Sequence, residues 1–316
     1  MVLSMSEPFS RRLTSALYAK KSALVVGLDP RVNELPPTLL NQYRTDKGLT
    51  LEAAAEAVLE FNKGLIDSLH DLVVAVKPQL AFYECLGLPG LAAFAATLNY
   101  AREHSLLVIT DGKRNDIGSS VAGYADAYLG ETALGDSSYP AFPSDSLTVN
   151  PYLGSDGITP LVERCQNYKK GIFVLVKTSN PSGTEIQNLD CGGEKVFEVV
   201  GRLCHEWGLS SLDSDGYSAV GAVVGATYPA EAAKLRKIMP HAYFLVPGFG
   251  AQGAKPQDVV TCFNNDGYGA VVNSARDIIY AFTKRGGDYK MAARSAALEA
   301  TQSINKALRE AEKCAW

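Results

Sequence analysis

The chain has 316 residues, of which 47% are hydrophobic and 20% charged, and its formal net charge at pH 7 is −4. This composition is typical of a globular protein with one large or two small domains. The weak negative charge gives no electrostatic reason to expect a nucleic acid or a membrane surface as a partner, so an anionic small molecule would have to be held by a few local cations.

The cysteines and the N-terminal sequence bear on the compartment. The six cysteines are scattered without a C-x-x-C pair, which is not the pattern of a zinc site or a disulfide framework. A reducing compartment is therefore expected. The N-terminal sequence MVLSMSEPFSRRLTSALYAKK lacks the apolar run of a signal peptide, and no stretch approaches the length of a membrane span. We expect a cytoplasmic protein.

Eight short apolar runs alternate with longer segments of helical pattern. In chain order the runs are residues 23–29, 73–79, 106–113, 146–152, 171–178, 219–225, 243–250 and 269–276. They are nearly continuous in apolar residues, which is typical of strands buried on both faces of a parallel sheet. The alternation predicts an α/β protein with a (β/α)8 TIM barrel as a single domain over residues 1–316, and an open doubly wound sheet is the alternative. Loop insertions are expected near 31–49, 131–145 and 208–217.

Polar residues follow most of the predicted strands at their C-terminal ends, where barrels of this kind carry their chemistry. One such residue has a trivial explanation, because strand ends are solvated, but a ring of them on one face favours a site there. They are Asp29, Lys77, Asp111 with Lys113 and Asp116, Asn150, Lys177 with Thr178 and Ser179, Gln252 and Arg276.

The densest group is D-G-K-R-N-D-I, residues 111–117. Asp111 and Lys113 are two residues apart, so in an extended backbone their side chains leave on the same face. Asp116 follows where the strand has already turned. Lys77 from the neighbouring strand completes two ammoniums and two carboxylates that could alternate. The alternative is a solvated loop of unlike charges that contributes little energy.

The segment V-P-G-F-G-A-Q-G-A, residues 246–254, contains a G-x-G-x-x-G at Gly248, Gly250 and Gly253. A dinucleotide site is a weak interpretation, because the motif follows the seventh strand rather than opening a first βαβ unit. Glycines let backbone amides approach an anion, and Arg276 at the end of the eighth strand supplies a cation suited to phosphate. A tight glycine turn beside an unrelated surface arginine is the alternative.

Lys177 could form a Schiff base, but it precedes Thr178 and Ser179 and could instead point into the helix layer. The four histidines fall at the other end of the predicted barrel, where surface or packing roles are expected. The sequence has no metal-binding or serine-hydrolase motif, so no metal is expected.

Seven motifs in order resemble the orotidine 5'-phosphate decarboxylase family, most closely its longer-chain bacterial subfamily, type 2. The resemblance touches all but the sixth strand, although D-x-K-x-x-D alone also occurs in related sugar-phosphate decarboxylases. The motifs are G-L-D-P (27–30), K-P-Q-L-A-F-Y-E (77–84), D-G-K-R-N-D-I-G (111–118), V-N-P-Y-L-G (149–154), K-T-S-N-P (177–181), P-G-F-G-A-Q-G (247–253) and N-S-A-R (273–276).

The resemblance implies decarboxylation of orotidine 5'-phosphate to UMP, the last step of de novo pyrimidine biosynthesis, without a cofactor. Lys113 and Asp111 should flank the reacting C6, with Lys113 as the proton donor to it. Lys77 should contact the ribose and order the charge network, and Asp29 should hydrogen-bond the ribose. Asp116 should reach into the site of a partner subunit, which implies a homodimer.

The resemblance implies further substrate contacts outside this cluster. Ile117 should enter the partner's site beside Asp116, Ser179 should bind the pyrimidine edge, and Gln252 and Arg276 should hold the phosphate. Ser120, Thr178 and Gly253 are expected among the substrate-binding residues.

Three other functions remain open. A Mg2+-dependent sugar-phosphate decarboxylase or synthase would share the barrel, and a Schiff-base aldolase would use Lys77 or Lys177. A non-catalytic protein that binds a nucleotide phosphate is the third, but the joint presence of Asp111, Lys113 and Asp116 argues against it.

Overall fold

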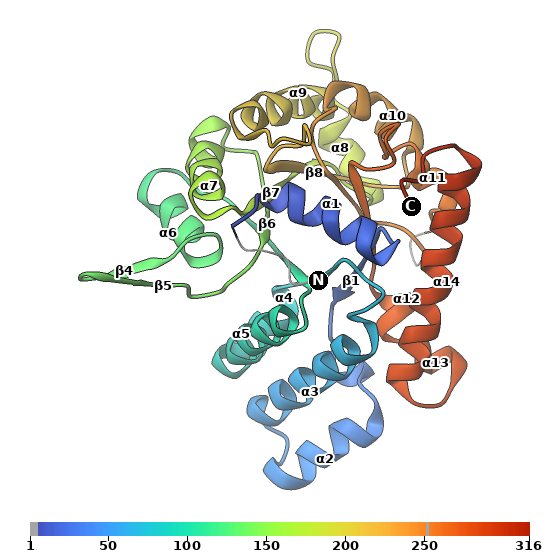
Figure 1. Ribbon diagram of the computed structural model, residues 1–316. Helices are drawn as coiled ribbons and strands as arrows, with labels where there is room; N and C mark the ends of the chain where they lie inside the picture. Colours follow the sequence, from blue (N-terminus) through green and yellow to red (C-terminus); the bar gives the residue numbers. More distant parts are fainter. Residues whose placement is uncertain (1–5, 251–252) are drawn as a thin grey trace.

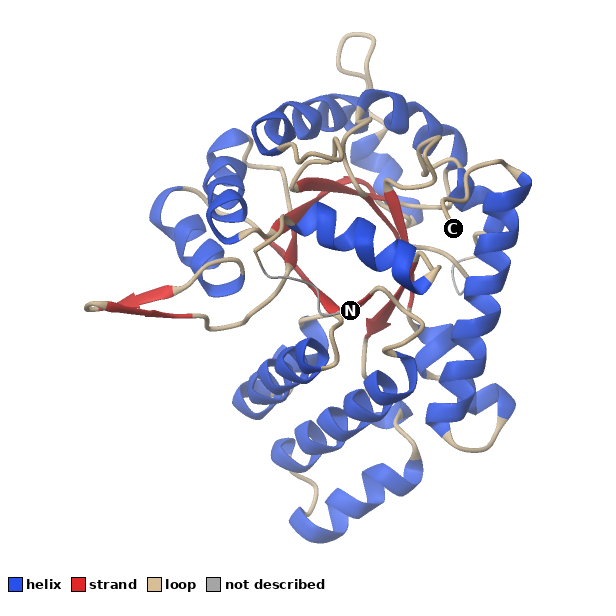
Figure 2. Ribbon diagram, in the orientation of Figure 1, coloured by secondary structure: helices blue, strands red, loops and turns tan. Residues whose placement is uncertain are grey.

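The computed structural model describes residues 6–250 and 253–316. In this part of the chain, eight parallel strands close into a barrel in the order β1-β10-β9-β8-β7-β6-β3-β2 (Figures 1 and 2). Each strand lies in or within one residue of a predicted apolar run. The barrel is confirmed over the open sheet, because β10 pairs with β1 and closes the ring. The strands are β1 Leu24–Leu28, β2 Ala75–Pro78, β3 Leu107–Arg114, β6 Ser146–Val149, β7 Gly171–Lys177, β8 Val220–Val224, β9 Phe244–Val246 and β10 Ala270–Ser274.

Helices surround the barrel and bury one face against it. The α-helices are α1 Phe9–Lys20, α2 Pro37–Lys47, α3 Leu51–Leu69, α4 Ala81–Glu84, α5 Gly87–Glu103, α6 Gly118–Tyr128, α7 Ser155–Tyr168, α8 Thr184–Gln187, α9 Val196–Gly208, α10 Pro229–Ile238, α11 Pro256–Val260, α12 Arg276–Ile279, α13 Ala281–Arg285 and α14 Tyr289–Glu310. Short 3-10 helices are η1 Val32–Glu34, η2 Pro181–Gly183 and η3 Leu209–Ser211. Over the residues that are described, none of these helices has the length and hydropathy to cross a membrane.

Burial explains why the strands read as apolar runs. Every residue of β1 and β8 is buried, since one side of each strand faces the barrel interior and the other faces the helices. The helix α3 shows the complementary pattern, because Phe61 and Leu65 on its inner face are fully buried. The helix begins after Thr50, whose hydroxyl accepts a hydrogen bond from the Ala53 amide at 3.1 Å and so caps an otherwise unpaired donor.

Helix α1 lies across the N-terminal end of the barrel (Figure 1). Arg12 on this helix is buried and donates to Asp145 Oδ1 at 2.6 Å, just before β6. The second carboxylate oxygen of Asp145 accepts from the Val108 amide at 2.9 Å, and Lys170 Nζ lies 3.8 Å from the first oxygen. A sealed ion cluster thus joins α1 to the starts of three neighbouring strands, β3, β6 and β7.

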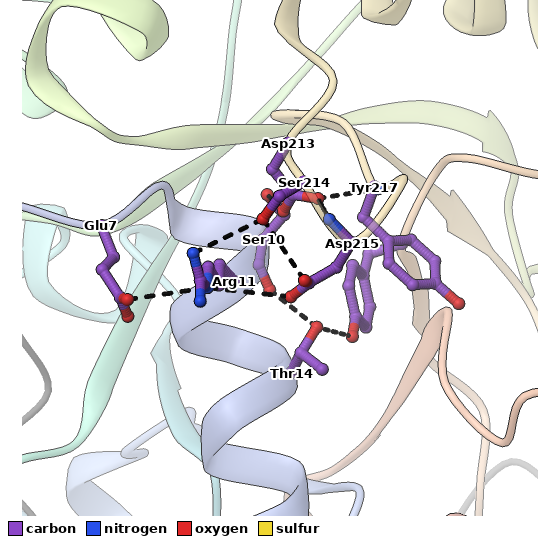
Figure 3. A network of polar contacts seen from close by, with 9 residues as sticks. Glu7, Ser10, Arg11, Thr14, Asp213, Ser214, Asp215 and Tyr217 are labelled. Atoms are coloured by element: carbon purple, nitrogen blue, oxygen red, sulfur yellow. Dashed lines mark hydrogen bonds and ion pairs between the residues drawn. The ribbon is translucent and has the colours of Figure 1, made fainter.

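A second polar contact fastens α1 to the loop before β8 (Figure 3). Ser10 donates to Asp213 Oδ2 at 2.5 Å, and the Thr14 hydroxyl lies 2.7 Å from the Tyr243 hydroxyl. Arg11 is half-exposed and lies 3.6 Å from Glu7 and 4.0 Å from Asp215. The ion pairs of Arg11 thus lie on the exposed face of α1, whereas the opposite face of the helix is buried.

The expected insertions contain secondary structure of their own. Residues 131–145 include an antiparallel hairpin of β4 Thr132–Leu134 and β5 Ser137–Tyr139, which projects away from the barrel beside α6 (Figure 2). Residues 31–49 hold η1 and α2, and α2 packs against α3. In 208–217, which includes η3, the Asp213 carboxylate accepts from the amides of Asp215 and Tyr217.

Candidate active site

A cluster of charges lies at the C-terminal ends of β2 and β3 and is centred on Asp111. Lys77 Nζ donates to Asp111 Oδ2 at 2.9 Å, and Lys113 Nζ donates to Oδ1 at 2.6 Å. Two neutral groups complete the shell: Gln79 Nε2 donates to Oδ2 at 2.9 Å and the Thr148 hydroxyl to Oδ1 at 2.8 Å. Asp111 is therefore held in one orientation by four donors, two of them cationic.

The backbone of β3 is irregular where it carries this cluster. Thr110 pairs with Leu147 and Arg114 with Val149, so β3 has two more residues than β6 over the same stretch. Lys113 takes up the irregularity with φ of 49°, a left-handed conformation that is uncommon outside glycine, and its amide donates to Thr148 Oγ1 at 3.0 Å. The Asp111 and Lys113 side chains meet as predicted, but through this bulge rather than through an extended strand.

Burial and charge act in opposite directions on the cluster. Burial by itself would raise the pKa of Asp111, but the Lys77 and Lys113 ammoniums outweigh it and hold that pKa well below its usual range. Burial likewise opposes the charged form of Lys77, but Asp111 and Asp29 outweigh it and raise the pKa of Lys77. Both groups therefore remain charged at neutral pH.

A cavity of about 220 Å³ opens over this cluster. Its polar wall includes the charged cluster, the loop after β7 and Asn273 of β10, and its apolar wall consists of Leu175 of β7, Val223 of β8, Leu245 of β9 and Pro247 directly after β9. The lining residues are Lys77, Asp111, Lys113, Thr148, Leu175, Thr178, Ser179, Asn180, Val223, Leu245, Pro247 and Asn273. Charged residues and hydroxyl-bearing residues thus line one space large enough for part of a small molecule.

Asp29 lies directly after β1, near the charged cluster, and one of its carboxylate oxygens is unpaired among the described residues. Its Oδ1 is buried and has no hydrogen-bond partner among the described residues, and the same holds for Asn273 Oδ1. A side chain at Gly27 would approach both oxygens, at 3.2 Å from Asp29 and 3.4 Å from Asn273. Burial raises the pKa of Asp29, Lys77 opposes this shift and Asp111 adds to it. Two acceptors held close together suit a ligand that brings hydroxyl donors.

The glycine segment forms a tight loop after β9. Gly248, Gly250 and Gly253 have φ of 100°, 76° and 91°, so each needs the left-handed region that glycine adopts without cost. Arg276 is exposed at the first residue of α12, and its guanidinium has no hydrogen-bond or ion-pair partner among the described residues. A side chain at Gly250 would come within 2.5 Å of Asp277, so the loop lies against the start of α12. Gln252, predicted to hold a phosphate, lies outside the described residues.

Some predicted residues do not line the cavity of their own chain. Ile117 is 52% exposed, Ser120 is exposed on α6, and Asp116 Oδ1 accepts from the Ile117 amide at 2.8 Å. Asn150 lines a separate, neighbouring cavity of about 490 Å³. The roles expected for Asp116, Ile117 and Ser120 therefore stay predictions.

Lys177 is the predicted strand-end residue that the structure moves away from the site. Its side chain is fully buried, and its Nζ lies 4.4 Å from the centre of the Tyr228 ring and 5.2 Å from that of Phe197. It therefore points into the helix layer, and the Schiff-base interpretation of Lys177 is wrong. Gln79, Thr148 and Asn273 also belong to the site but are not among the predicted residues, although Gln79 belongs to the K-P-Q motif and Thr148 lies two residues before Asn150.

The chain is similar to known proteins along most of its length. A sequence model described as the orotidine 5'-phosphate decarboxylase / HUMPS family matches residues 22–285. The orotidine 5'-phosphate decarboxylase of Rhodopirellula baltica is 46% identical over 273 residues, which are 86% of this chain and 88% of the relative. The enzyme of that name from Caldicellulosiruptor bescii is 40% identical over 301 residues, covering 95% of this chain and 99% of the relative.

Solved structures agree as well. The OMP decarboxylase of Leishmania donovani superposes with a TM-score of 0.72 at 28% identity, covering 95% of this chain and 98% of that one. The type 2 subfamily stays a prediction. Because the family match spans most of the chain and the relatives match along nearly their whole length, this chain belongs to the orotidine 5'-phosphate decarboxylase / HUMPS family.

Proposed function

We propose that the chain decarboxylates orotidine 5'-phosphate to UMP, without a cofactor, in the cavity above Asp111. The observation that carries the proposal is the Lys77–Asp111–Lys113 cluster, which lines one cavity together with Thr178 and Ser179. The names of the relatives, at up to 46% identity, support the same reaction.

The reaction needs charge where a carbanion develops. The C6–carboxylate bond breaks, its electron pair stays on C6, and CO2 leaves. No ring carbonyl delocalises that pair directly, so an ammonium close to C6 has to stabilise it and then supply the proton. Lys113 suits both tasks, because its side chain is 47% exposed toward the cavity while Asp111 fixes its ammonium. The proton that Lys113 loses is replaced from solvent.

Asp111 supports this role by remaining ionised. Its low pKa, set by the two ammoniums against burial, keeps a negative charge beside Lys113 throughout the cycle. Lys77 is buried and donates a hydrogen bond to Asp111 Oδ2, so it orders the carboxylate. The charge of Asp29 also acts on Lys77 and helps to raise its pKa, so the two side chains lie near each other. We assign the ribose hydroxyls to Asp29 and Lys77.

The remaining contacts divide between the base and the phosphate. The Ser179 hydroxyl, with Thr178 beside it, is assigned to the pyrimidine edge. The exposed Arg276, the backbone of Gly253 and the side chain of Gln252, which directly precedes Gly253 in the sequence, are assigned to the phosphate. Phosphate recognition at the loops after the last two strands is common in barrels of this architecture.

A homodimer completes the proposed site. Asp116 and Ile117 follow the β3 bulge and lie outside the cavity of their own chain, and Ile117 leaves an apolar side chain 52% exposed. The resemblance to the family implies that Asp116 and Ile117 reach the site of a partner subunit, and their position outside the cavity of their own chain supports that assignment. We therefore assign Asp116, Ile117 and Ser120 to the site of the partner subunit.

The proposal is tested by following the ultraviolet absorbance of orotidine 5'-phosphate after purified protein is added, with and without EDTA. Turnover that EDTA leaves unchanged, and that the Lys113→Ala variant lacks, is the expected result. Turnover that EDTA abolishes would indicate the Mg2+-dependent sugar-phosphate chemistry of the same superfamily. Tight UMP binding without turnover would indicate a nucleotide-binding protein instead.

A further inference from the structure

The segment after β7, residues 178–188, forms a loop whose two ends are tied together. The Thr178 amide donates to Gln187 Oε1 at 3.0 Å, and Gln187 Nε2 donates back to Thr178 Oγ1 at 2.7 Å. The Thr178 hydroxyl in turn donates to Asn180 Oδ1 at 2.6 Å. Thr178, Ser179 and Asn180 line the cavity, so this pairing sets where the recognition hydroxyls lie.

Lys177 adds a further tie at the base of the same loop. A bulge at the end of β7, where Leu175 pairs with Val223 but Lys177 pairs with Val224, turns its side chain out of the barrel, although Leu175 lines the cavity. Lys177 Nζ donates to Asn188 Oδ1 at 2.6 Å. The rings of Tyr228 and Phe197 face the same ammonium.

Stability alone gives a poor reason for a lysine at this position. A buried ammonium is costly to desolvate, and an apolar side chain of similar length would fill the space without that cost. Burial indeed lowers the pKa of Lys177, and the more distant Glu231 opposes it only in part. The compensation is specific: two aromatic faces attract the cation and Asn188 accepts its hydrogen bond.

The loop is also fixed from its other side, at Ser179. A side chain at Gly225 would come within 2.9 Å of the Ser179 backbone, so β8 and this residue are in close contact. The Thr227 hydroxyl donates to the Ser179 carbonyl at 3.3 Å. Ser179 therefore lies between a fixed strand end and a loop that Asn188 and Gln187 close.

We propose that Lys177 is a positioning residue for recognition of the base: through Asn188 it fixes the 178–188 loop so that Ser179 presents its hydroxyl to the pyrimidine. This inference rests on the proposed function, since it is the proposed substrate that brings the pyrimidine. Lys177 touches neither the cavity nor the charge cluster, so the chemistry at Lys113 does not depend on it directly.

The test compares a ligand that has the base with one that lacks it. The dissociation constants of UMP and of ribose 5-phosphate are measured for the wild type and for Lys177→Met, Asn188→Leu and Asn188→Asp. In the first two variants we expect UMP affinity to fall about 10-fold, the loss of one charge-assisted hydrogen bond, with ribose 5-phosphate unchanged. Asn188→Asp keeps the acceptor for Lys177 and should therefore bind UMP as tightly as the wild type does. In turnover, KM should rise more than kcat falls.

Lys170→Met is the matched control. Lys170 directly precedes β7, Lys177 is the last residue of the same strand, and burial lowers the pKa of both lysines. It should lower stability without changing the ratio of the two affinities. Hydrogen exchange of the amides in 178–188, measured without ligand, should be faster in Lys177→Met and unchanged in Lys170→Met. Asn188 is only half-buried, so its variants keep the test valid if Lys177→Met fails to fold.

Two kinds of outcome overturn the inference. If the wild type turns over orotidine 5'-phosphate but the Lys177 and Asn188 variants lose UMP and ribose 5-phosphate affinity equally, or lose neither, the proposed function stands and the role of Lys177 fails. If the wild type neither binds UMP nor turns over orotidine 5'-phosphate, the proposed function fails and base recognition fails with it.

Discussion

The two ends of the barrel each carry a carboxylate between two cations, and they differ in how exposed the second cation is to solvent. At the N-terminal end Asp145 lies between Arg12 and Lys170, and the side-chain exposures of the three are 2%, 1% and 11%. At the C-terminal end Asp111 lies between Lys77 and Lys113, and Lys113 is 47% exposed. The same ionic unit therefore closes one end and leaves a cation open to a cavity at the other.

Backbone geometry separates the two clusters as well. Lys113 has φ of 49° within an irregular stretch of β3, whereas Asp145 makes regular strand contacts on both sides, with its amide bound to Val108 and its carbonyl to Gly171. Strain at a functional residue persists only where the surroundings hold it in place, as Thr148 and Asp111 do here. We propose that the sealed cluster serves stability and the open one serves chemistry, and this division can be tested.

The largest expected effect is that of Lys113→Ala on turnover. We expect kcat for orotidine 5'-phosphate to fall by about 10³-fold or more, since positioned general acids alone contribute about 10²–10⁴-fold. The urea midpoint should change little, because Asp111 keeps Lys77, Gln79 and Thr148 as donors. Lys169→Ala is the control, because this exposed lysine at the other end also has a left-handed φ, 58°. Equal losses of activity in both variants would refute a special role for Lys113.

The next effect is on stability, from Arg12→Met. This change leaves Asp145 buried with only the more distant Lys170 as a cation, and breaking a buried pair in this way typically costs about 3–5 kcal/mol. The free energy of unfolding from urea titration should fall by that amount, while kcat of the folded enzyme stays unchanged. Arg11→Met on the same helix removes only exposed pairs and should cost less than about 1 kcal/mol. A similar loss in both variants would mean that α1 itself, not the buried pair, sets the stability.

Arg276→Ala tests whether a cation that has no partner within residues 6–250 and 253–316 is reserved for a ligand. UMP affinity should fall about 10- to 100-fold, the range for a charge-assisted contact to phosphate, while uridine affinity stays unchanged. Isothermal titration measures both. Arg285→Ala is the control, because the Arg285 guanidinium is already paired with Glu299. A loss of uridine affinity equal to that of UMP would contradict the phosphate assignment.

The sequence predicts the barrel because strands that are buried on both faces consist almost entirely of apolar residues. The strands β1 and β8, in which every residue is buried, are the clearest examples. It also predicts the meeting of Asp111 and Lys113, since two residues on one strand cannot separate far. The Arg12–Asp145 pair joins residues 133 positions apart, and nothing local in the chain links them. Such contacts follow from the closed topology and not from a motif.

Two different physical reasons account for what the sequence left open or missed at the site. Lys177 ends a predicted strand like the other candidates, but one extra residue in β7 turns its side chain into the helix layer. Thr148 and Gln79 are neutral polar residues at the ends of strands, where solvent exposure is the ordinary expectation. Only the position of Asp111, with four donors around it, shows what they do.

The smallest expected effect is a gain in stability from Asp29→Asn, because burial raises the pKa of Asp29 and its Oδ1 has no partner in the described part of the chain. A carboxyl whose folded pKa is raised destabilises the fold at pH values above that pKa, where it must ionise while buried. The penalty disappears below the ordinary pKa of aspartate, about 3.9, where the group is protonated in both states. At pH 7 we expect the variant to be more stable by about 1 kcal/mol.

The direction of the pH dependence makes this prediction specific to Asp29. The stabilising effect of Asp29→Asn in urea titrations should shrink as the pH falls toward 4, whereas Asp111, whose pKa is lowered, contributes stability above the ordinary aspartate range and loses it only as the pH falls further. Asp136→Asn in the exposed hairpin should change stability by less than about 0.5 kcal/mol at either pH. If Asp29→Asn instead destabilises the protein at pH 7, the unpartnered oxygen is already paired within the fold, and the ribose hydroxyls would have to be assigned elsewhere. A gain in stability together with weaker UMP binding would show that the Asp29 carboxylate destabilises the fold but contributes to ligand binding.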